Sequence, residues 1–400
     1  MNRPPDRLWD KGTPLDSRVL AYTAGEDHAL DDRLVAYDVR ASIAHATGLH
    51  AVGLLSAADL TLLTQALQAA GAAHANGEWR VQLEQEDGQT ALEAQLIARA
   101  GAAGGRIHLG RSRNDQVLVA LRLYLRDAVA RIAAGAEQVA AALDRLASRH
   151  AELPLPGYTH LQQAMPSSVA LWAGGFAAEI RDDADGLHSV LRRLDKSPLG
   201  SAAGYGTPAL PLDREATAHE LGFAAAQMPV TAVQLSRGKA EAQLLFEITL
   251  LMTDFGRLSA DLMLYYTQEF AFVKLPDAFT TGSSIMPQKR NPDVFELIRG
   301  RTATAQACLH EALGLTAKLT SGYHRDLQLL KVPVFRGIDL ALATTDLLPV
   351  ALDGVTFVPE NIHLDPSIHA AEQANRLVVE EGIPFREAYR RVGQQLFGKK

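Results

Sequence analysis

Apolar residues recur every three or four positions over most of the chain, which is the period of an amphipathic α-helix. The longest such patterns cover about residues 114–152, 166–195, 244–269, 292–320 and 334–352. In the third of these, the steps alternate between four and three, as in a heptad seam. Alternating apolar patterns of strand length are nearly absent. The patterning therefore predicts a mainly α protein.

Shorter helical patterns lie outside these long runs. A mixed polar arm opens the chain, and we expect the first helix to begin near Asp31. Two short helices are expected within residues 33–75, and Ser56 has the spacing of an N-cap for the second. A further helix is expected over residues 84–103, which glycines from Gly101 onward would end.

The length of the long patterns bounds the architecture. A helix of roughly 35 residues is on the order of 50 Å long. Such rods suit a bundle whose core several chains share, so we expect an oligomer. We divide the chain into an N-terminal helical domain (1–110), a central long-helix bundle (111–352) and a short C-terminal helical domain (353–400).

Composition mainly excludes functions. The chain has 400 residues, of which 47% are hydrophobic and 21% charged, as in ordinary soluble globular proteins. A net charge of −7 argues against a nucleic-acid partner. The single cysteine, Cys308, excludes a disulfide framework and is expected to be a buried thiol. Neither a signal core nor a membrane-spanning run is evident, so we expect a cytoplasmic location and no membrane partner.

Polar clusters lie at the ends of the long helical patterns. The most informative is the loop 281–293, where a glycine precedes two adjacent serines, and a lysine, an arginine and an asparagine follow. A glycine-containing, cation-rich loop that leads into a helix N-terminus is suited to hold an anion. Asn291 is expected to cap that helix, with Pro292 in its first turn. A plain linker between two helices is the alternative.

Three further clusters have related compositions. Residues 108–115 bring two arginines, a serine and an asparagine to the start of the longest helix, which favours a carboxylate or a phosphate. Residues 157–166 contain His160 in a turn bounded by glycine and proline, and residues 321–331 contain a tyrosine, a glutamine and a lysine. For each cluster a structural role is the alternative: helix caps, a structural histidine or solvated polar surface.

The residue inventory suits proton abstraction next to a carboxylate, because cations and N–H donors can stabilise the developing enolate-like charge. No metal-ligand, nucleotide-loop or nucleophile-elbow motif is present in the sequence, so we expect no metal and no cofactor. A serine acts as a base only if its pKa is strongly lowered, here by Lys289 and N–H donors. His160 is the candidate for handling the departing amine, and Glu296 is the candidate for orienting that imidazole.

Together these clusters resemble a known family. Residues 282–292, Gly-Ser-Ser-Ile-Met-Pro-Gln-Lys-Arg-Asn-Pro, are similar to the signature loop of the fumarase/aspartase superfamily. Residues 110–117, 157–162 and 322–328 resemble the argininosuccinate lyases within that superfamily. The resemblance covers about residues 20–395.

The resemblance implies a fumarase/aspartase-like homotetramer, in which long helices form the central bundle and three subunits contribute to each active site. It implies the reversible, cofactor-free β-elimination of argininosuccinate to L-arginine and fumarate, a step of arginine biosynthesis. It places the catalytic base on Ser283 rather than Ser284 and the acid or its helper on His160, paired with Glu296 and assisted by Lys289. The substrate-binding residues that it implies are Ser112, Arg113, Asn114, Thr159, Gln162, Asn291, Tyr323, Gln328 and Lys331.

The chain departs from the family pattern at three places. Gln89 stands where the family usually has histidine, which excludes proton transfer at that position. Asp27 stands where a serine contacts the substrate, and its carboxylate would repel a dicarboxylate. The C-terminal domain is short, and the chemistry is expected to survive this. Two alternatives stay open: another fumarate-releasing lyase of the superfamily, or a non-catalytic structural protein like the lens crystallins.

Overall fold

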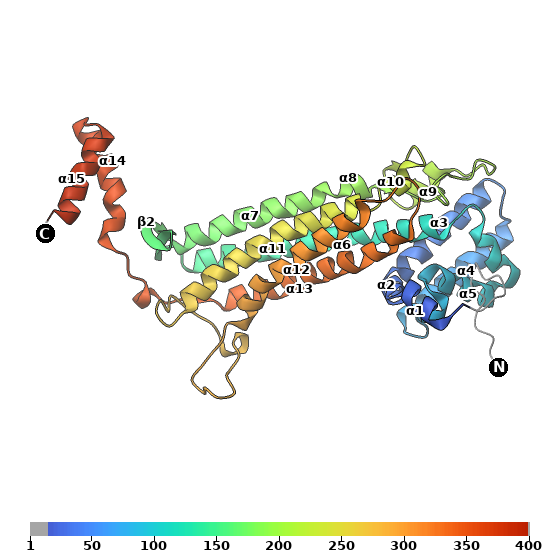
Figure 1. Ribbon diagram of the computed structural model, residues 1–400, viewed down its shortest axis with the longest axis horizontal. Helices are drawn as coiled ribbons and strands as arrows, with labels where there is room; N and C mark the ends of the chain where they lie inside the picture. Colours follow the sequence, from blue (N-terminus) through green and yellow to red (C-terminus); the bar gives the residue numbers. More distant parts are fainter. Residues whose placement is uncertain (1–14, 399–400) are drawn as a thin grey trace. The chain divides into compact units, whose positions relative to one another are not determined.

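A computed structural model describes residues 15–398, in which α-helices predominate and strands are short (Figure 1). The predicted mainly α class is confirmed. The chain forms two compact units. Residues 1–14 of the expected polar arm lie outside the described residues, and the three-domain division stays a prediction. The first unit contains the described part of Met1–Ala133, Asp185–Thr249 and Ala303–Ala341, and the second contains Ala134–Ala184, Leu250–Thr302 and the described part of Leu342–Lys400.

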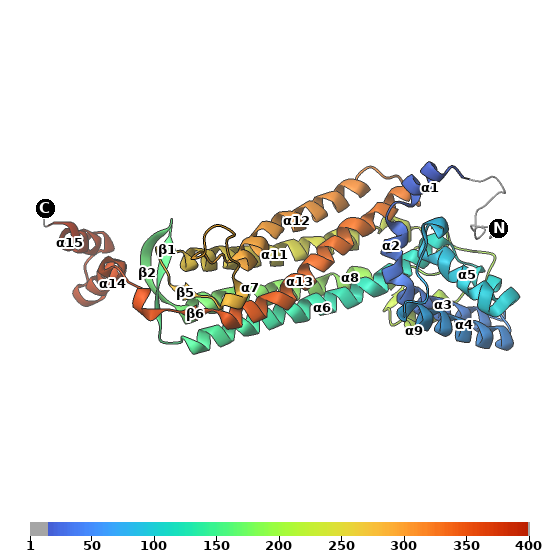
Figure 2. The same ribbon diagram turned by 90° about the horizontal axis from the view of Figure 1, so that it is seen from below.

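Long helices contribute segments to both units, and within each unit these segments lie side by side (Figures 1 and 2). All five long helical patterns of the sequence form such helices, although their ends differ by a few residues from the predicted ones. The helices are α6 (Arg113–Arg149), α7 (Val169–Ser189), α11 (Lys239–Tyr266), α12 (Asp293–Thr316) and α13 (Lys331–Gly354).

Aromatic contacts join these helices inside each unit. In the first unit, the rings of Tyr124 on α6 and Phe335 on α13 have centroids 5.0 Å apart. In the second unit, Trp172 on α7 lies 5.7 Å from Tyr265 on α11, and its Nε1 donates to Asp261 at 2.9 Å. Edge-to-face ring pairs add to the free energy of area burial, so the apolar stripes read from the sequence are the surfaces that pack.

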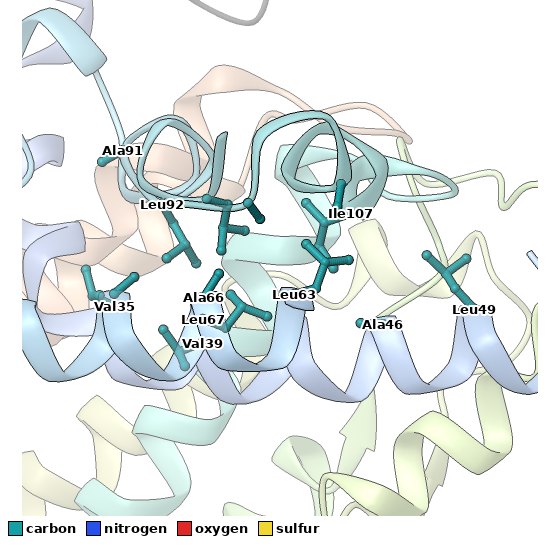
Figure 3. Close-up of a cluster of buried hydrophobic side chains, with 14 of the residues drawn as sticks. Val35, Val39, Ala46, Leu49, Leu63, Ala66, Leu67, Ala91, Leu92 and Ile107 are labelled. Atoms are coloured by element: carbon teal, nitrogen blue, oxygen red, sulfur yellow. The ribbon is translucent and has the colours of Figure 1, made fainter. Parts of the chain in front are cut away.

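The first unit has its own apolar core, built from α3 (Val35–Ala51), α4 (Ala57–Ala75) and α5 (Gly88–Ala100) (Figure 3). Leu63 and Leu92 are almost fully buried in this core. Burying one such side chain stabilises the fold by about 1.5–3 kcal/mol. The core therefore fixes the positions of α3, α4 and α5 relative to one another.

Capping side chains decide where these helices begin. The Ser56 hydroxyl accepts from the backbone N–H of Asp59 at 3.1 Å, as its spacing predicts. The next helix was expected to begin near residue 84, but α5 begins at Gly88, because the Asp87 side chain caps it by accepting from Thr90 N at 2.8 Å. The preceding residues Leu83–Gln85 form a 3₁₀ turn instead.

The start of the chain was also predicted wrongly. The first helix does not begin near Asp31, because α1 (Ser17–Ala24) and α2 (Asp27–Asp31) precede that point. Asp16 caps α1 by accepting from Arg18 N at 2.8 Å, which is a signal that the polar composition of this stretch conceals.

A β-hairpin interrupts the predicted helical arrangement in the second unit. Strands β1 (Pro154–Thr159) and β2 (Gln162–Ser168) pair antiparallel around a two-residue turn, so α7 begins three residues later than expected. The turn residues His160 and Leu161 have φ of 53° and 58°. Both values lie in the left-handed region, which matches the twist of a tight hairpin but is unfavourable for non-glycine residues.

The remaining elements are short. In the second unit, turns at Pro359 and Pro366 precede two helices, as the sequence predicts. The short elements are 3₁₀ turns η1 (Asp32–Leu34), η3 (Gly101–His108), η4 (Asp277–Phe279), η5 (Arg325–Leu330), η6 (Pro359–Asn361) and η7 (Pro366–His369); helices α8 (Leu191–Leu194), α9 (Arg214–Glu220), α10 (Ala232–Leu235), α14 (Ala370–Glu381) and α15 (Phe385–Phe397); the parallel pair β3 (Lys196–Ser197) and β4 (Ala225–Ala226); and the antiparallel pair β5 (Val273–Lys274) and β6 (Thr356–Phe357).

Two adjacent glycines in η3 provide a test of how tightly this turn packs on α5. A Cβ on Gly104 would lie 2.7 Å from backbone atoms of Leu96 and Ile97, whereas a Cβ on Gly105 would meet nothing within 4 Å. We expect Gly104→Ala to destabilise the protein by about 1–3 kcal/mol, because backbone atoms cannot move aside as side chains do. Thermal unfolding of both variants checks this, with Gly105→Ala as the control. Equal unfolding temperatures would show that η3 does not pack as described.

Candidate active site

A polar cavity of about 170 Å³ lies in the first unit. Its walls come from α2, from the segment before and at the start of α5, from the first turns of α6, from the turn before α11, and from the residues between α12 and α13 with the first residue of α13. It is lined by Asp27, Glu86, Asp87, Gln89, Arg113, Asn114, Val117, Arg237, Tyr323, Arg325, Gln328 and Lys331.

Predicted site residues from two separate clusters of the sequence line this cavity together. Arg113 and Asn114, from the start of α6, line it together with Tyr323, Gln328 and Lys331. Ser112 lies beside them, and its hydroxyl accepts from Asn114 N at 3.3 Å. Asp27 and Gln89, the two positions at which we expect the chain to depart from the family pattern, line the same cavity. The departures from the family pattern therefore lie among the predicted substrate-binding residues.

Lys331 is the most buried cation of this cavity, with 3% of its side chain exposed. Its ammonium forms ion pairs with the carboxylates of Asp27 and Asp31. Burial alone would lower the pKa of Lys331, but Asp31 and Asp27 outweigh burial, and the pKa is raised. Burial raises the pKa of Asp27 to about 7, although the nearby Lys331 opposes this effect. Two carboxylates of the chain itself thus hold this ammonium.

The same carboxylates connect several elements around the cavity. The second oxygen of Asp31 accepts from the backbone N–H of Gly88 at 3.0 Å, which joins α2 to the start of α5. Arg113 donates to Asp87 at 2.5 Å and lies 3.7 Å from Glu86. Charge-assisted hydrogen bonds of this kind are stronger than neutral ones, so they orient the guanidinium of Arg113.

The segment before α13 is attached to the end of α1. Gln328 Nε2 donates to Thr23 O at 3.0 Å, and Arg325 donates to the same carbonyl at 3.0 Å. Arg325 also lies 4.0 Å from Glu86. The side-chain amide of the predicted ligand Gln328 therefore already donates to backbone carbonyls of the chain while it lines the cavity.

Sequence reasoning missed several lining residues, of which Arg237 is the most unusual. Arg237 is 5% exposed, and its guanidinium lies 5.6 Å from the centre of the Tyr323 ring. Its Nε and Nη1 are buried without a hydrogen-bond partner. Arg237 stands between Ser236 and Gly238 in a short polar segment that leads into α11, and this segment has no other sign of a site. Glu86, Asp87 and Arg325 belong to polar segments of the sequence, but the sequence pattern alone assigns them no role in the site.

The predicted base loop lies in the second unit. Backbone hydrogen bonds between Thr281 and Asn291, of 3.0 and 2.8 Å, close the loop at its base. The Ser283 hydroxyl is half-buried and accepts from the N–H groups of Ile285 at 3.4 Å and Met286 at 3.2 Å. Ser284 is exposed. The backbone thus directs positive dipoles at the oxygen of Ser283.

The helix after this loop begins differently from the prediction. The first residue of α12 is Asp293, so Pro292 precedes the helix rather than standing in its first turn. Asn291 does not have the expected capping role, because its side-chain N–H donates weakly toward Thr281 Oγ1 and Gly282 O at 3.4 and 3.5 Å. Its amide stays with the loop that carries Ser283.

The histidine cluster lies on the hairpin of the second unit. Thr159 and Gln162 are register partners at the end of the hairpin, and all residues from Thr159 to Gln162 are exposed. Lys289 and Glu296 are exposed as well. In the described part of this chain, no hydrogen bond or ion pair joins His160 to Glu296. Their pairing therefore stays a prediction.

The predicted residues thus form two sets, one in each unit. The first unit contains the cavity and the predicted Ser112, Arg113, Asn114, Tyr323, Gln328 and Lys331. The second contains Thr159, His160, Gln162, Ser283, Lys289, Asn291 and Glu296.

Not every residue of these clusters serves the cavity. Arg111 is buried and donates to the Ser42 hydroxyl at 2.7 Å, and its neighbour Asp115 accepts from Gly200 N and Ala202 N at 2.9 and 2.8 Å. Structural roles therefore account for these two. Cys308 is a buried free thiol, as predicted.

Residues 15–398 contain no group of three or more His, Cys, Asp or Glu side chains placed to hold a metal ion. Among the helices of this same range, none combines the length and the apolar character needed to cross a membrane.

Known proteins resemble this chain over almost its whole length. A family model described as a lyase matches residues 17–306. The argininosuccinate lyase of Sorangium cellulosum (strain So ce56) is 50% identical over 392 residues, which are 98% of this chain and 90% of that protein. The argininosuccinate lyase of Xanthomonas campestris pv. campestris (strain B100) is 44% identical over 387 residues, which are 96% of this chain and 89% of that protein.

Among solved structures, a class II fumarase from Schistosoma mansoni matches with a TM-score of 0.79. The match has 17% sequence identity and covers 97% of this chain and 91% of the fumarase chain. At that identity the similarity concerns the fold alone. It confirms the fumarase-like fold that the sequence predicted.

The pKa of Asp27 leads to a prediction for stability. An unfolded aspartate ionises near 3.8 and folded Asp27 near 7, so the folded state holds the extra proton between these values. The contribution of Asp27 to the free energy of unfolding is fully present below about pH 3.8. It falls by up to about 1.4 kcal/mol per pH unit as the pH rises to about 7. We expect Asp27→Asn to remove this loss. Loss of the pair with Lys331 adds a shift of its own, so the expected result concerns the trend: the unfolding temperature of Asp27→Asn minus that of the wild type should increase as the pH rises from 5 to 8.

The matched control is Asp326→Asn, which removes an exposed carboxylate from the neighbouring turn. Its unfolding temperature should follow the wild type at every pH. If Asp27→Asn also follows the wild type, Asp27 does not carry a proton in the folded protein near neutral pH.

Proposed function

This chain belongs to the argininosuccinate lyases of the lyase family, and from this premise we propose that it cleaves argininosuccinate reversibly to L-arginine and fumarate. The observation that carries the proposal is the 50% identity to an argininosuccinate lyase across 98% of the chain. The reaction is a β-elimination without a cofactor, and it is a step of arginine biosynthesis. A cytoplasmic location stays a prediction from the sequence.

Ser283 is the proposed base, which removes the proton next to a carboxylate of the substrate. The N–H groups of Ile285 and Met286 point at its hydroxyl oxygen, so they would stabilise an ionised serine. The neighbouring Ser284 is exposed. Lys289 follows in the same loop, and its charge would favour both the ionised serine and the dianionic intermediate. These features support Ser283 over Ser284.

His160 is the proposed acid, or its helper, at the departing guanidinium nitrogen, with Glu296 as its carboxylate partner. The two residues make no contact within the described chain. This arrangement agrees with the proposed homotetramer, in which three subunits contribute to each active site, because the partner of His160 would then come from another copy. Thr159, Gln162 and Asn291 are proposed to contact the substrate from this part of the site.

The cavity of the first unit is proposed to hold much of the substrate. Arg113, Asn114, Tyr323 and Gln328 line it, and Ser112 lies beside them. Its acidic side chains Asp27, Glu86 and Asp87 complement the guanidinium of argininosuccinate, whereas its cations complement the carboxylates. The predicted role of Lys331 is the least direct, since two carboxylates of the chain already hold its ammonium.

Release of fumarate tests the function. We expect purified protein to release fumarate from argininosuccinate, which is followed by the ultraviolet absorbance of the new carbon–carbon double bond. Malate, aspartate and adenylosuccinate serve as comparison substrates. Fumarate from one of these but not from argininosuccinate would assign the chain to another lyase of the superfamily. No turnover of any of them would favour a non-catalytic protein.

Replacement of single serines tests the base. We expect Ser283→Ala to lower kcat by at least about 100-fold, because general-base catalysis contributes roughly this much or more. The neighbouring Ser284→Ala is the matched control and should keep a rate near that of the wild type. Light scattering should show the same oligomer for both variants. Near-normal kcat in Ser283→Ala would place the base elsewhere.

A further inference from the structure

Two buried polar side chains without hydrogen-bond partners lie close together in the sequence, one on α10 and one in the turn that follows it. Arg237 is 5% exposed, and its Nε and Nη1 make no hydrogen bond. Gln234, three residues earlier, is 4% exposed, and both its Nε2 and its Oε1 lack a partner. A buried polar group without a hydrogen bond costs about 1–3 kcal/mol, and more if it is charged. Two such groups this close together point to a ligand that satisfies them.

Both side chains face the same space. They line a cavity of about 140 Å³ in the first unit, with the exposed Lys239 and with Thr316 on other walls. Arg237 also lines the larger polar cavity, where the Tyr323 ring lies 5.6 Å from its guanidinium. Arg237 is therefore shared by the two cavities.

Charge pairing separates Arg237 from the other cations of the larger cavity. Arg113 and Arg325 lie within 4.0 Å of acidic side chains, and Lys331 is held by two carboxylates. Among the described residues, no carboxylate oxygen lies within 4.0 Å of the Arg237 guanidinium. The buried carboxylates of Glu241, Asp27 and Asp31 act on Arg237 only at longer range. A substrate carboxylate thus meets a neutralised ammonium at Lys331 and an unpaired guanidinium at Arg237.

We propose that Arg237 and Gln234 form a carboxylate subsite of the active site, and that Arg237 rather than Lys331 supplies its positive charge. The inference rests on the proposed function. Arg237 binds the carboxylate through its planar N–H groups, and the Gln234 amide nitrogen donates to the same group. The Gln234 oxygen accepts from an N–H on the carbon next to that carboxylate. Argininosuccinate has this pairing at both ends, in its arginine part and in its succinyl part.

Kinetics of a variant without the guanidinium test the subsite. We expect Arg237→Met to raise KM for argininosuccinate about 10- to 100-fold, because hydrogen bonds to charged groups have this strength. Its unfolding temperature should not fall, since a buried guanidinium without a partner contributes little to stability. Arg237→Lys keeps the charge and should recover part of the loss in KM. A structural role would instead lower the unfolding temperature and leave KM unchanged.

Arg126→Met is the matched control. Arg126 also lies over an aromatic ring, 5.1 Å from the centre of Phe223, but it lines neither cavity. Its replacement should leave KM unchanged. An equal rise of KM in Arg126→Met and Arg237→Met would overturn the proposal.

Ligand-induced stabilisation separates this subsite from the proposed reaction. L-arginine represents the amino-acid end of the substrate, and L-aspartate represents its succinyl end with the attached nitrogen. We expect at least one of them to raise the unfolding temperature of the wild type and of Arg126→Met but not of Arg237→Met, and the effective ligand identifies the end that binds. This result would support the subsite even if argininosuccinate were not cleaved. Equal shifts in Arg237→Met and wild type, or no shift in the wild type, would overturn it.

Discussion

The buried ammonium of Lys331 holds together the helices that line the polar cavity of the first unit. Lys331 is the first residue of α13, and its ammonium pairs with Asp27 and Asp31 on α2. Asp31 in turn accepts from Gly88 N at the start of α5. Removing one partner of a buried ion pair leaves an uncompensated charge, so these elements depend on one another for their positions. The same pairing neutralises the charge of Lys331. Other residues of the cavity are therefore needed to bind a carboxylate of the substrate.

The substitution that brings Asp27 into this cluster changes the electrostatics of the cavity. A serine at this position would offer a substrate one hydroxyl, whereas Asp27 adds a second carboxylate to the ammonium. Burial keeps its pKa near 7, so the cluster carries less negative charge at neutral pH than its composition implies. Repulsion of a substrate carboxylate is reduced for this reason. The cavity then depends on Arg237, whose guanidinium has no carboxylate within 4.0 Å among the described residues.

The sequence predicted the fold well where one local signal sufficed. The period of the apolar residues identified the long helices, and capping by Ser56 identified the start of α4. The hairpin Pro154–Ser168 was missed, because prolines and polar residues replace the alternation that marks a strand and its pairing is set by the His160–Leu161 turn. The site followed the same rule. Dense polar clusters revealed Arg113 and Ser283, whereas Arg237 lies in the short polar segment 236–241, which resembles an ordinary helix start. No local pattern could pair Asp27 with Lys331.

The hairpin turn also bears on why His160 does not contact Glu296 within the described chain. His160 and Leu161 both adopt left-handed backbone conformations, and Leu161 is 75% exposed. Strained non-glycine residues typically cost on the order of 1–3 kcal/mol each, and an exposed leucine gains nothing from burial. The β1–β2 pairing holds the turn in place, but it leaves Leu161 exposed. Under the proposed homotetramer, contact with another copy would bury Leu161 and bring His160 to its carboxylate partner. The strain is then the cost of presenting an imidazole to a neighbouring subunit.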